Sequence, residues 1–599
     1  MSNGRPPADA RAGTRQRARR PVPNEEGLRS LGEQMQRSAA APRRGRSGAG
    51  PSGPDGPDGP LDVTGSQPYP DPRDPLGRRT RRGRRKMRRW TKVLLVSGLV
   101  LVVLVGAVAG YLGYLNSLIH RIKVLGLSSG ATSGALANTE NILLVGSTSR
   151  CDLKVQNLAY GLCSNGVTGV NSDVVMVLHL NPSTHSVSII SIPRDLFVPN
   201  ARTSGANKID AALAQSPSQL VAAIQEDFGI PIQHYVELNF DTFAGVVDAL
   251  GGIDMYFPEP VFDDYSGLVV LAPGCIHLDG TRALQVVRAR HLQYKGPGVT
   301  ATNYHYWPQE AQSDLARIRR DHEFLRVLAT AVSHQGLGNP LTDRQIIASV
   351  ASQLTVDGGF GATDMVNLVL TFHSVNVGSA PQLTIPVMES SSLTYYYQGY
   401  DYGNIEFPSE PQDQQVIDQA LGVSSSIDTM TGKPLPGPGS VTVSVLNGSG
   451  VANQAADTSS ALGALGFSMV GLGDVASPAT QSETVVYYSG PSTEAAAEAV
   501  AHSLSGAVIM AQGPTTDGAQ VTVVTGSDFS VNPPPATGSG GTASTAAPGG
   551  VTASTAATTA ASGAAGVSDS GSFSAPTPAT EVLQPWDPRS CTPSGGEGP

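Results

Sequence analysis

The sequence predicts an α/β protein in which a layered sheet is flanked by helices, with a small βαβαβ unit after it and one membrane helix before it. Three observations lead to this fold class. A single uncharged apolar run lies near the N-terminus, at residues 93–115. Apolar strand-like runs then alternate with amphipathic helical patterns over 139–400, which favours a sheet covered on both faces. A shorter alternation of the same kind follows over 440–526.

The first 92 residues differ in charge from the rest of the chain. They carry 22 Lys and Arg against 9 Asp and Glu, whereas the remainder carries 18 against 40. Residues 1–92 are also poor in large apolar side chains, so they are predicted to be a disordered basic tail. Such a tail could bind nucleic acid, but the favoured interpretation is a topology signal lying on the anionic inner surface of the membrane.

Residues 93–115 form a run of 23 uncharged residues, which is long enough to cross a bilayer as a helix. An arginine-rich stretch precedes this run, and only Arg121 and Lys123 follow it closely. Because positive charge is retained in the cytoplasm, the N-terminus is predicted to be cytoplasmic and the later domains extracytoplasmic. The long basic leader is unlike a cleaved signal peptide. We therefore expect a single-pass protein of the cell membrane.

Outside the membrane, the four cysteines can form disulfides. Cys151 and Cys163 bracket a short polar loop and are the favoured pair. Spacing alone leaves the other pairings, with Cys275 and Cys591, open. No CxxC motif or paired histidine spacing indicates a zinc site.

The domain at 139–400 is predicted to follow a Gly- and Ser-rich stalk at 116–138. Its strand-like runs are flanked by Asn, Pro and Ser turn signals. Strands are predicted at 141–147, 173–180 and 187–193, and helices at 217–229, 240–252 and 313–332.

The remaining boundaries follow from composition. Residues 401–439 are rich in Pro, Gly and Asp and are predicted to be a linker. The small domain at 440–526 follows, and residues 527–599 are almost entirely Ala, Thr, Gly, Ser and Pro. Such a segment does not form a packed core, so a disordered tail is expected.

Arginine recurs where strand-like runs end. Arg150 and Arg194 follow the first and third strands, while Arg288 and Arg290 end an apolar run whose i, i+2 spacing would place both on one side of a strand. Arg317 begins a basic helical stretch. Ligands of open α/β sheets bind at the carboxyl ends of strands, so these arginines predict an anion site. Because a guanidinium pairs bidentately with phosphate, the set suggests a diphosphate.

Two carboxylates stand beside these arginines. Asp173 opens a strand and Asp195 directly follows Arg194. Carboxylates next to bound phosphates commonly hold Mg²⁺, although arginines and aspartates also form ordinary surface ion pairs. His291 follows Arg290 and is either a proton-transfer group or a packing residue.

A family resemblance emerges from the order of these motifs. "NILLVGSTSR", "NSDVVMVLHLNP", "VSIISIPRDLFV", "ANKIDAAL", "LDGTRALQVVRARH" and "DLARIRRDHEFL" occur in the order of the LytR-CpsA-Psr family. The resemblance covers about residues 140–335 densely. The unit at 440–526, marked by "VSVLNGSG", resembles the LytR C-terminal domain.

The resemblance implies a phosphotransferase that moves a glycopolymer from an undecaprenyl-diphosphate carrier onto peptidoglycan, with Mg²⁺ as cofactor. Its arginines bind the diphosphate, and Asp173 together with position 148 is associated with the metal. Matched by position, the diphosphate ligands are Arg150, Arg194, Arg288, Arg290 and Arg317, and the expected catalytic residues are Arg194, Asp195, Arg288 and Arg290.

The chain departs from the family pattern at three places. Thr148 stands where the family usually has Asp, Asn171 where it commonly has Arg, and Asp321 where it commonly has Gln. Two alternatives to transfer stay open: a lipid-diphosphate hydrolase with water as acceptor, and a wall-binding scaffold without turnover. High Ala, Gly and Pro content hints at an actinobacterial source but does not identify the glycopolymer.

Overall fold

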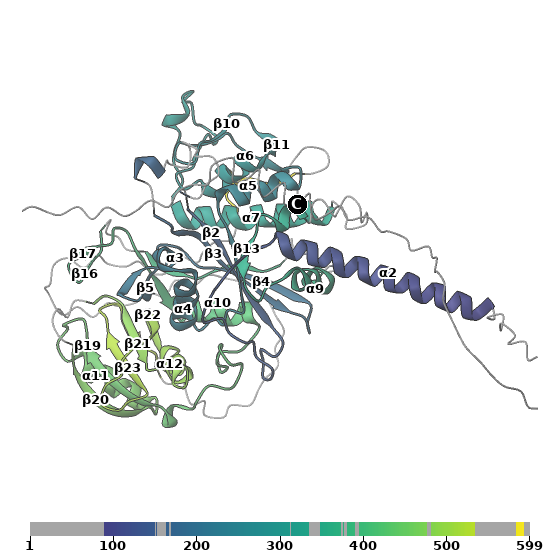
Figure 1. Cartoon of the computed structure of the whole chain (residues 1–599). Coiled ribbons are helices and arrows are strands. Elements are labelled where there is room, and N and C mark those ends of the chain that lie inside the picture. The colour runs from purple at the N-terminus through teal and green to yellow at the C-terminus, as the bar shows by residue number, and fades with distance from the viewer. Residues whose placement is uncertain are drawn as a thin grey trace, which may run out of the picture. The chain divides into compact units, whose positions relative to one another are not determined.

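The computed structural model describes the chain from the apolar N-terminal helix onward. Elements are labelled as in Figure 1. The predicted disordered N-terminal tail falls outside the described residues up to residue 88. The described residues are 89–149, 151, 163–166, 169–311, 313–334, 348–372, 375, 380–389, 394–475, 481–533 and 583–591.

The first described element is α2 (Arg89–Leu118). It contains the predicted span and, at Ser97–Leu118, is long and apolar enough to cross a membrane by length and composition. Its last turn is part of the domain core, because Leu115 is buried against α9 (Ala362–Phe372). Strand β1 (His120–Ile122) follows at once and pairs in parallel with β13 (Thr355–Asp357). The first residues of the segment predicted as a stalk thus belong to the end of α2 and to a strand of the central sheet.

The central sheet has seven strands, in the order β1-β13-β7-β2-β3-β4-β14. Strand β3 runs antiparallel to β2 and β4, whereas β7 runs parallel to β2 and β14 parallel to β4. The carboxyl ends of β2, β4 and β7 therefore meet the start of β3 at one edge. The further bounds are β2 Glu140–Ser147, β3 Ser172–Asn181, β4 Ser186–Ser191, β7 His234–Leu238 and β14 Gln382–Thr384, and the first three match the predicted strands.

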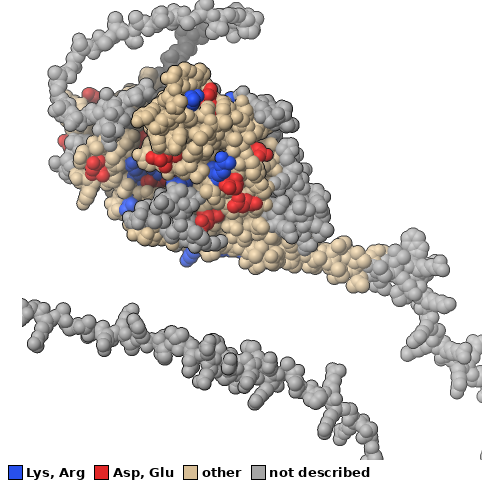
Figure 2. Space-filling view, turned by 90° about the horizontal axis from the view of Figure 1, so that it is seen from above, with Lys and Arg blue, Asp and Glu red and all other residues tan. Residues whose placement is uncertain are grey.

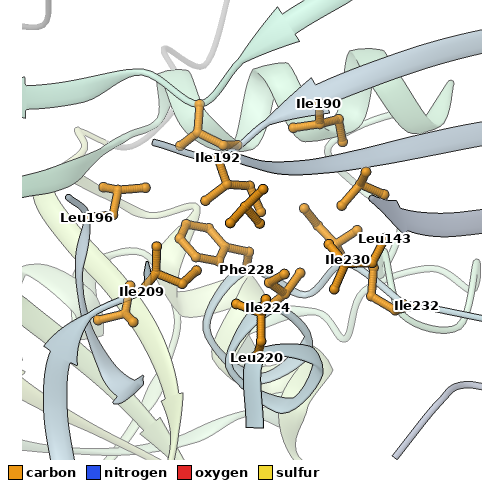
Figure 3. Close-up of a cluster of buried hydrophobic side chains, with 14 of the residues drawn as sticks. Leu143, Ile190, Ile192, Leu196, Ile209, Leu220, Ile224, Phe228, Ile230 and Ile232 are labelled. Atoms are coloured by element: carbon orange, nitrogen blue, oxygen red, sulfur yellow. The ribbon is translucent and has the colours of Figure 1, made fainter. Parts of the chain in front are cut away.

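Alternation along β2, β3 and β4 gives the sheet two different faces. Leu143, Val175 and Ile190 point into the largest core, which is shown in Figure 3. Their neighbours Leu144 and Val174 line a cavity on the opposite face. The strands are therefore apolar on both sides, as expected for a sheet covered by helices on both faces.

Helices cover the two faces as separate groups (Figure 1). The core face packs against α3, α4 and α10, while α5, α6 and α7 lie over the cavity face. Local caps fix two of the starts: Ser216 accepts a hydrogen bond from the amide of Gln219 before α4, and Asn239 forms a capping box with Thr242 before α5. The bounds are α3 Asp210–Gln215, α4 Pro217–Phe228, α5 Phe240–Ala249, α6 Gly280–Arg288, α7 Ser313–His334 and α10 Gln412–Leu421.

The apolar run before Arg288 is a helix that ends at Arg288, so the strand prediction for this run was wrong. Asp279 caps α6 by accepting a hydrogen bond of 2.8 Å from the amide of Arg282. Apolar residues then recur at helical rather than strand spacing, with one set facing the cavity and another facing a second core. Arg288 is the last residue of this helix, and Arg290 follows in the connection after it.

Short strands extend this side of the domain into two small sheets, β10-β9-β12 and β11-β8-β25. Strand β25 (Arg589–Ser590) belongs to the tail that was predicted to be disordered throughout. Residues 583–591 instead pack on the domain, and Cys591 forms a disulfide with Cys275. The other bounds are β8 Ile253–Phe257, β9 Val261–Asp263, β10 Leu268–Val270, β11 Gly274–Leu278, β12 Gln293–Tyr294, β5 Phe197–Arg202 and β6 Gly205–Lys208.

The C-terminal unit adds an eight-stranded sheet ordered β15-β18-β22-β21-β23-β19-β20, with β24 on β22. Its prediction as βαβαβ missed β20 and β22. The interval predicted as a linker contains β18, whose Phe407 packs in a small core with Phe197, and α10, whose Ile417 and Leu421 pack in the largest core. The bounds are β15 Val387–Glu389, β18 Glu406–Glu410, β19 Thr442–Asn447, α11 Gln454–Ala464, β20 Ser468–Asp474, β21 Thr484–Tyr488, α12 Glu494–Ala501, β22 Leu504–Gln512, β23 Val521–Thr525 and β24 Phe529–Val531.

Candidate functional site

An apolar cavity of about 150 Å³ lies between the central sheet and helices α5, α6 and α7. Its floor comes from residues 144–147 at the end of β2 and from alternate residues of β3, and its walls come from helical residues spaced three or four apart. This spacing is expected where an amphipathic helix faces an interior space. The principal apolar lining residues are Leu144, Val174, Met176, Val236, Leu238, Phe240, Phe243, Leu284, Val287, Phe324 and Leu325.

Polar residues line the same cavity where strands and helices end. Ser147 ends β2, Asn239 follows β7, and Arg288 ends α6. The guanidinium carbon of Arg288 lies 4.7 Å from the ring centroid of Phe240, within the range of a cation–π contact. One positive charge therefore borders a space that is otherwise apolar.

Asp321, on α7, also lines the cavity and is buried. Neither of its carboxylate oxygens has a hydrogen-bond partner among the described residues, and its Oδ2 lies 3.8 Å from the Nε of Arg317. Burial raises the pKa of Asp321 to about 8. The side chain is thus neutral at neutral pH, like the glutamine that is common in the family at this position.

Next to the cavity lies a set of five charged residues that we name the arginine–aspartate cluster: Asp173, Arg194, Asp195, Arg290 and Asp314. Arg194 forms an ion pair with Asp173, and its Nε lies 3.5 Å from Asp195 Oδ2. Arg290 bridges the two other carboxylates, at 3.1 Å from Asp195 Oδ2 and 3.1 Å from Asp314 Oδ1. The predicted catalytic residues Arg194, Asp195 and Arg290 therefore do converge.

The carboxylates keep Arg194 charged in spite of burial. Burial opposes the charge of Arg194, but Asp173, Asp195 and Asp314 outweigh it and raise the pKa of its guanidinium. Burial also opposes ionisation of Asp195, yet Arg194 and other cations lower the pKa of this carboxyl below its ordinary value. Arg194 and Asp195 therefore each stabilise the charged form of the other. On the face shown in Figure 2, acidic and basic side chains are likewise interspersed.

Three members of this neighbourhood were not identified from the sequence. Asp314 is buried and pairs with three arginines; Lys208 donates a hydrogen bond of 2.8 Å to Asp195; and Asp210 accepts one of 3.2 Å from Asn171. Burial raises the pKa of Asp210 to about 6. Asp314 starts the motif "DLARIRRD", but a lone aspartate at the start of a helical pattern does not show that three arginines converge on it.

Arg317 lies behind the cluster rather than on its surface. Its side chain is 3% exposed, and its Nη2 lies 3.2 Å from Asp314 Oδ1. Arg317 is thus placed to hold Asp314, with little surface of its own for a ligand. Arg150 lies outside the described residues.

The two residues predicted to bind metal occupy neighbouring strand ends. Thr148 is buried after β2, and its Oγ1 accepts a hydrogen bond of 2.9 Å from the amide of Asn171. Asp173 lies near the start of β3 and is bound by Arg194. One carboxylate and one hydroxyl suit Mg²⁺ only when phosphate oxygens and water supply most of its ligands. The residues present fit that mode of binding and not an all-protein cage.

The four cysteines form two disulfides, Cys151–Cys163 and Cys275–Cys591. Cys151 and Cys163 are joined, with an S–S distance of 2.11 Å, which is the pairing that the sequence favoured. The second bridge, Cys275–Cys591, was left open by spacing because it spans 316 residues. His291 packs on Tyr265, with ring centroids 4.4 Å apart, which favours a packing role.

Family comparison agrees with this architecture. Residues 128–410 match the model of the LytR_cpsA_psr family, and residues 440–529 match that of the LytR cell envelope-related transcriptional attenuator. Residues 128–410 belong to the LytR-CpsA-Psr family. We refer to them as the LytR-CpsA-Psr domain and to residues 440–529 as the LytR C-terminal domain.

Several proteins are similar to part of this chain. "Probable cell wall biosynthesis protein LcpB" of Corynebacterium glutamicum is 34% identical over 275 residues, which is 45% of this chain and 58% of that protein. The teichoic acid transferase TagU of Bacillus anthracis is 34% identical over 143 residues, 24% of this chain and 46% of TagU. The match thus spans roughly half the length of each relative.

Solved structures were also similar to this chain. A "LytR-Csp2A-Psr enzyme from Actinomyces oris" is 24% identical, covers 51% of this chain and 96% of its own, and has a TM-score of 0.38. Bacillus subtilis TagV is 22% identical, covers 48% and 98%, and has a TM-score of 0.36. The family assignment therefore rests on the sequence match.

Proposed function

We propose that this protein is a cell-wall phosphotransferase that moves a glycopolymer from an undecaprenyl-diphosphate carrier onto peptidoglycan. The observation that carries the proposal is an apolar cavity bordered by Arg288, next to a cluster that holds the partly exposed guanidinium groups of Arg194 and Arg290. A lipid diphosphate has the same two parts, an apolar chain and an anionic head. The relatives named as a cell wall biosynthesis protein and a teichoic acid transferase support the same reaction class.

The apolar cavity is suited to a prenyl chain because its lining offers no hydrogen bonds except at the polar residues near one end. Its volume of about 150 Å³ sets how much chain fits without rearrangement. A cavity of roughly this size accommodates one benzene-sized molecule, or about one five-carbon isoprene unit. A longer carrier would extend out of the cavity or separate α5 and α6 from the sheet. Each buried CH₂ would contribute about 0.8 kcal/mol.

The diphosphate would lie between Arg288 at the cavity and Arg194 and Arg290 in the cluster. A phosphate that binds there competes with Asp195 and Asp314, which hold Arg290 at 3.1 Å each. The carboxylates thus keep the guanidinium groups oriented before substrate binds, and a charged fork so arranged favours bidentate phosphate binding.

In the proposed reaction, an acceptor hydroxyl of peptidoglycan attacks the phosphorus nearer the glycopolymer. The new P–O bond forms as the bond to the prenyl-phosphate oxygen breaks, and that oxygen leaves with the electron pair. Arg194, Arg288 and Arg290 would stabilise the charge on the transferring and leaving oxygens. When bound through Asp173 and Thr148, Mg²⁺ would supply further charge stabilisation on the phosphate oxygens.

The proton of the acceptor hydroxyl needs a carboxylate that is ionised but still basic near neutral pH. Asp195 is poorly suited, because Arg194, Lys208 and Arg290 lower its pKa. Asp210 is better suited, because burial raises its pKa to about 6. We therefore favour Asp210 over Asp195 as the proton acceptor.

We further propose that α2 anchors the protein in the cell membrane with the N-terminus in the cytoplasm. The arginine-rich stretch before α2 supports this orientation, since positive charge is retained inside. The disulfides Cys151–Cys163 and Cys275–Cys591 support an oxidising environment for the domain beyond α2.

The deciding experiment uses the full chain in detergent, a synthetic undecaprenyl-diphosphate sugar and a peptidoglycan oligomer, with and without Mg²⁺. Mass spectrometry would follow the glycan on the acceptor. We expect Mg²⁺-dependent transfer that is lost in Arg288→Ala and retained in Arg282→Ala, an exposed arginine on the same helix.

Other outcomes would select the alternatives. Release of phosphorylated glycan without acceptor labelling would show a hydrolase, and tight lipid binding without product would show a scaffold. The Mg²⁺ assignment has its own variant, Thr148→Asp, which adds the carboxylate typical of the family. It should lower the Mg²⁺ concentration needed for half-maximal transfer, and an unchanged requirement would contradict a metal role for this position.

A further inference from the structure

The C-terminal segment 583–591, which we name the strap, is built into the LytR-CpsA-Psr domain. Its residues Arg589 and Ser590 pair as β25 with Tyr256 and Met255 of β8. The Trp586 indole stacks on Tyr294, with ring centroids 3.8 Å apart and planes 9° apart. A disulfide from Cys591 to Cys275 closes the segment covalently. These contacts are independent of one another, so the strap is a docked element of the domain.

At the centre of the strap is Asp587, a fully buried carboxylate. Its Oδ2 accepts a hydrogen bond of 2.6 Å from the Nε of Arg319, and its Oδ1 lies 3.6 Å from the Nη1 of Arg320. Glu310 completes the group, with its Oε1 2.7 Å from Arg320 Nη1. Two arginines of α7 are thus neutralised by two carboxylates, one of which comes from the C-terminal strap. Arg319 and Arg320 therefore have this role and do not belong to the diphosphate site.

Arg320 connects this buried group to the arginines of the candidate site. Its side chain is 0% exposed, and its Nη2 donates a hydrogen bond to the carbonyl oxygen of Ala289. Ala289 lies between Arg288 and Arg290, where α6 has ended and the backbone turns to an extended conformation. The segment after α6 is held again three residues later, because the backbone N–H of Glu310 donates a hydrogen bond of 2.9 Å to the Leu292 carbonyl.

These bonds fix the carbonyl side of the backbone after Arg288, while the amide of His291 donates a separate hydrogen bond of 2.7 Å to Asp263 Oδ2. The carbonyl of Ala289 is beyond the helical hydrogen-bond pattern, so its partner must come from another element. Arg320 supplies that partner, and Asp587 and Glu310 fix the position of Arg320. A fully buried arginine needs such compensation, because an uncompensated buried charge is costly.

We propose that the strap positions Arg288 and Arg290 through the path Asp587–Arg320–Ala289, so that Asp587, Glu310 and Arg320 are positioning residues of the site. The inference rests on the proposed function insofar as it assigns Arg288 and Arg290 to a diphosphate. The positional path itself does not depend on that assignment, and it can be tested without turnover.

The test compares full-chain variants by three readouts. Asp587→Asn removes the carboxylate, while the side-chain oxygen of the asparagine can still accept the hydrogen bond from the backbone N–H of Gln584. Cys275→Ser with Cys591→Ser removes the covalent link of the strap to the domain without changing any charge. The readouts are hydrogen exchange of the peptide 289–293, affinity for geranylgeranyl diphosphate, and the melting temperature. Asp474→Asn, at an exposed aspartate of β20, is the matched control.

We expect faster exchange at 289–293 in both variants and no change in the control. Affinity for the diphosphate should fall by about 10- to 100-fold, since small misplacements of binding groups have effects of this size. In transfer assays, Asp587→Asn should lower kcat more than it raises KM, because the arginines act mainly on the transition state.

Each other result has a distinct meaning. Unchanged exchange in a folded Asp587→Asn protein would overturn the inference, whatever the activity. If Asp587→Asn does not fold, Glu310→Gln decides, because it removes the charge of the other carboxylate that holds Arg320, and exchange equal to wild type there would overturn the inference as well. Wild-type protein that binds no diphosphate, but still shows the faster exchange in the variants, would contradict the proposed function and leave the positioning role established.

Discussion

Two clusters of buried ionisable groups in this molecule respond to burial in opposite ways. The arginine–aspartate cluster alternates arginines with carboxylates, and this pairing raises the pKa of Arg194 and lowers the pKa of Asp195, so both are held in their charged forms. A second group, which we name the carboxylate cluster, consists of Asp428, Glu494 and Glu498, whose nearest oxygens lie within 4.8 Å of one another. It lies where the LytR C-terminal domain meets the rest of the chain, since Thr429 donates a hydrogen bond of 2.7 Å to the Gly229 carbonyl.

The carboxylate cluster has no arginine or lysine in any ion pair found among the described residues; only His502 approaches it, at 3.9 Å from Glu498. Burial, together with repulsion from its neighbouring carboxylates, raises the pKa of Glu494 to about 8 and that of Glu498 to about 10. The comparison teaches that counter-charge, and not burial alone, decides whether a buried group can offer charge to a ligand. Only the arginine–aspartate cluster does so at neutral pH.

The largest expected effect comes from removing the shared cation of the charged cluster. Arg290→Ala leaves Asp195 and Asp314 without the guanidinium that bridges them. Transfer should fall by about 10²–10³, by analogy with the loss of one oxyanion-stabilising donor. A transfer assay with the lipid-linked donor would measure this loss.

Arg290→Lys sharpens the same prediction. A lysine keeps the charge but not the planar fork, so it should restore folding stability better than it restores transfer. Equal transfer by Arg290→Ala and wild type would remove Arg290 from the site.

A smaller effect is expected in the carboxylate cluster, as a pH dependence of unfolding. In the folded state Glu494 and Glu498 retain protons that the unfolded chain releases above the ordinary glutamate pKa. Their contribution to stability is therefore complete below about pH 4.5 and is lost as pH rises through about 8 for Glu494 and about 10 for Glu498. The free energy of unfolding should fall by about 1.4 kcal/mol per pH unit for each proton retained.

Denaturant unfolding between about pH 6 and about pH 9 would measure this slope, with a chelator present so that no divalent cation occupies the three carboxylates. Glu498→Gln cannot ionise and should make the slope shallower. A slope that is the same in this variant and in wild type would show that Glu498 is not protonated when buried.

The smallest expected effect is at Asp321, the acidic residue of the apolar cavity. Because its pKa is raised from the ordinary 3.8 to about 8, Asp321 is protonated in both the folded and the unfolded chain only below about pH 4, and there Asp321→Asn should change stability by less than about 1 kcal/mol. As pH rises from about 4 to about 8 the wild type loses stability, because the fold retains a proton that the unfolded chain releases, whereas the variant has no proton to retain and should be at least as stable as wild type at pH 7. A large loss of stability in Asp321→Asn at pH 7 would show that this carboxyl is charged in the fold.

The sequence predicted the parts of the fold that depend on local pattern. Strands β2, β3 and β4 and helices α4, α5 and α7 lie within a few residues of their predicted positions. The helix α6 was missed because its apolar run is short, and a short run fits a strand or a helix equally well. The strap was missed because its composition merges with the tail before it, and only the long-range partners Arg319 and Cys275 order it.

The same distinction holds for the site. Arg194, Asp195 and Arg290 were found because they follow motifs, and the structure brings them together. Asp314 was missed because a single aspartate on a helix gives no sign that three arginines will converge on it. Arg317 is buried and therefore supports the cluster without being accessible to a ligand. Its burial depends on how α7 packs, which the spacing of residues in the sequence does not predict.

The direct passage from α2 into β1 limits how far the domain can lie from this helix. The predicted stalk of 23 residues at 116–138, if extended, would act as a leash of roughly 75–80 Å. In the structure one residue separates the anchor helix from a strand of the central sheet, and Leu115 of the helix is itself part of the domain core. The domain is thus joined directly to α2, so under the function and the membrane anchoring that we propose the glycan acceptor would come to the membrane surface and the domain would not extend into the wall.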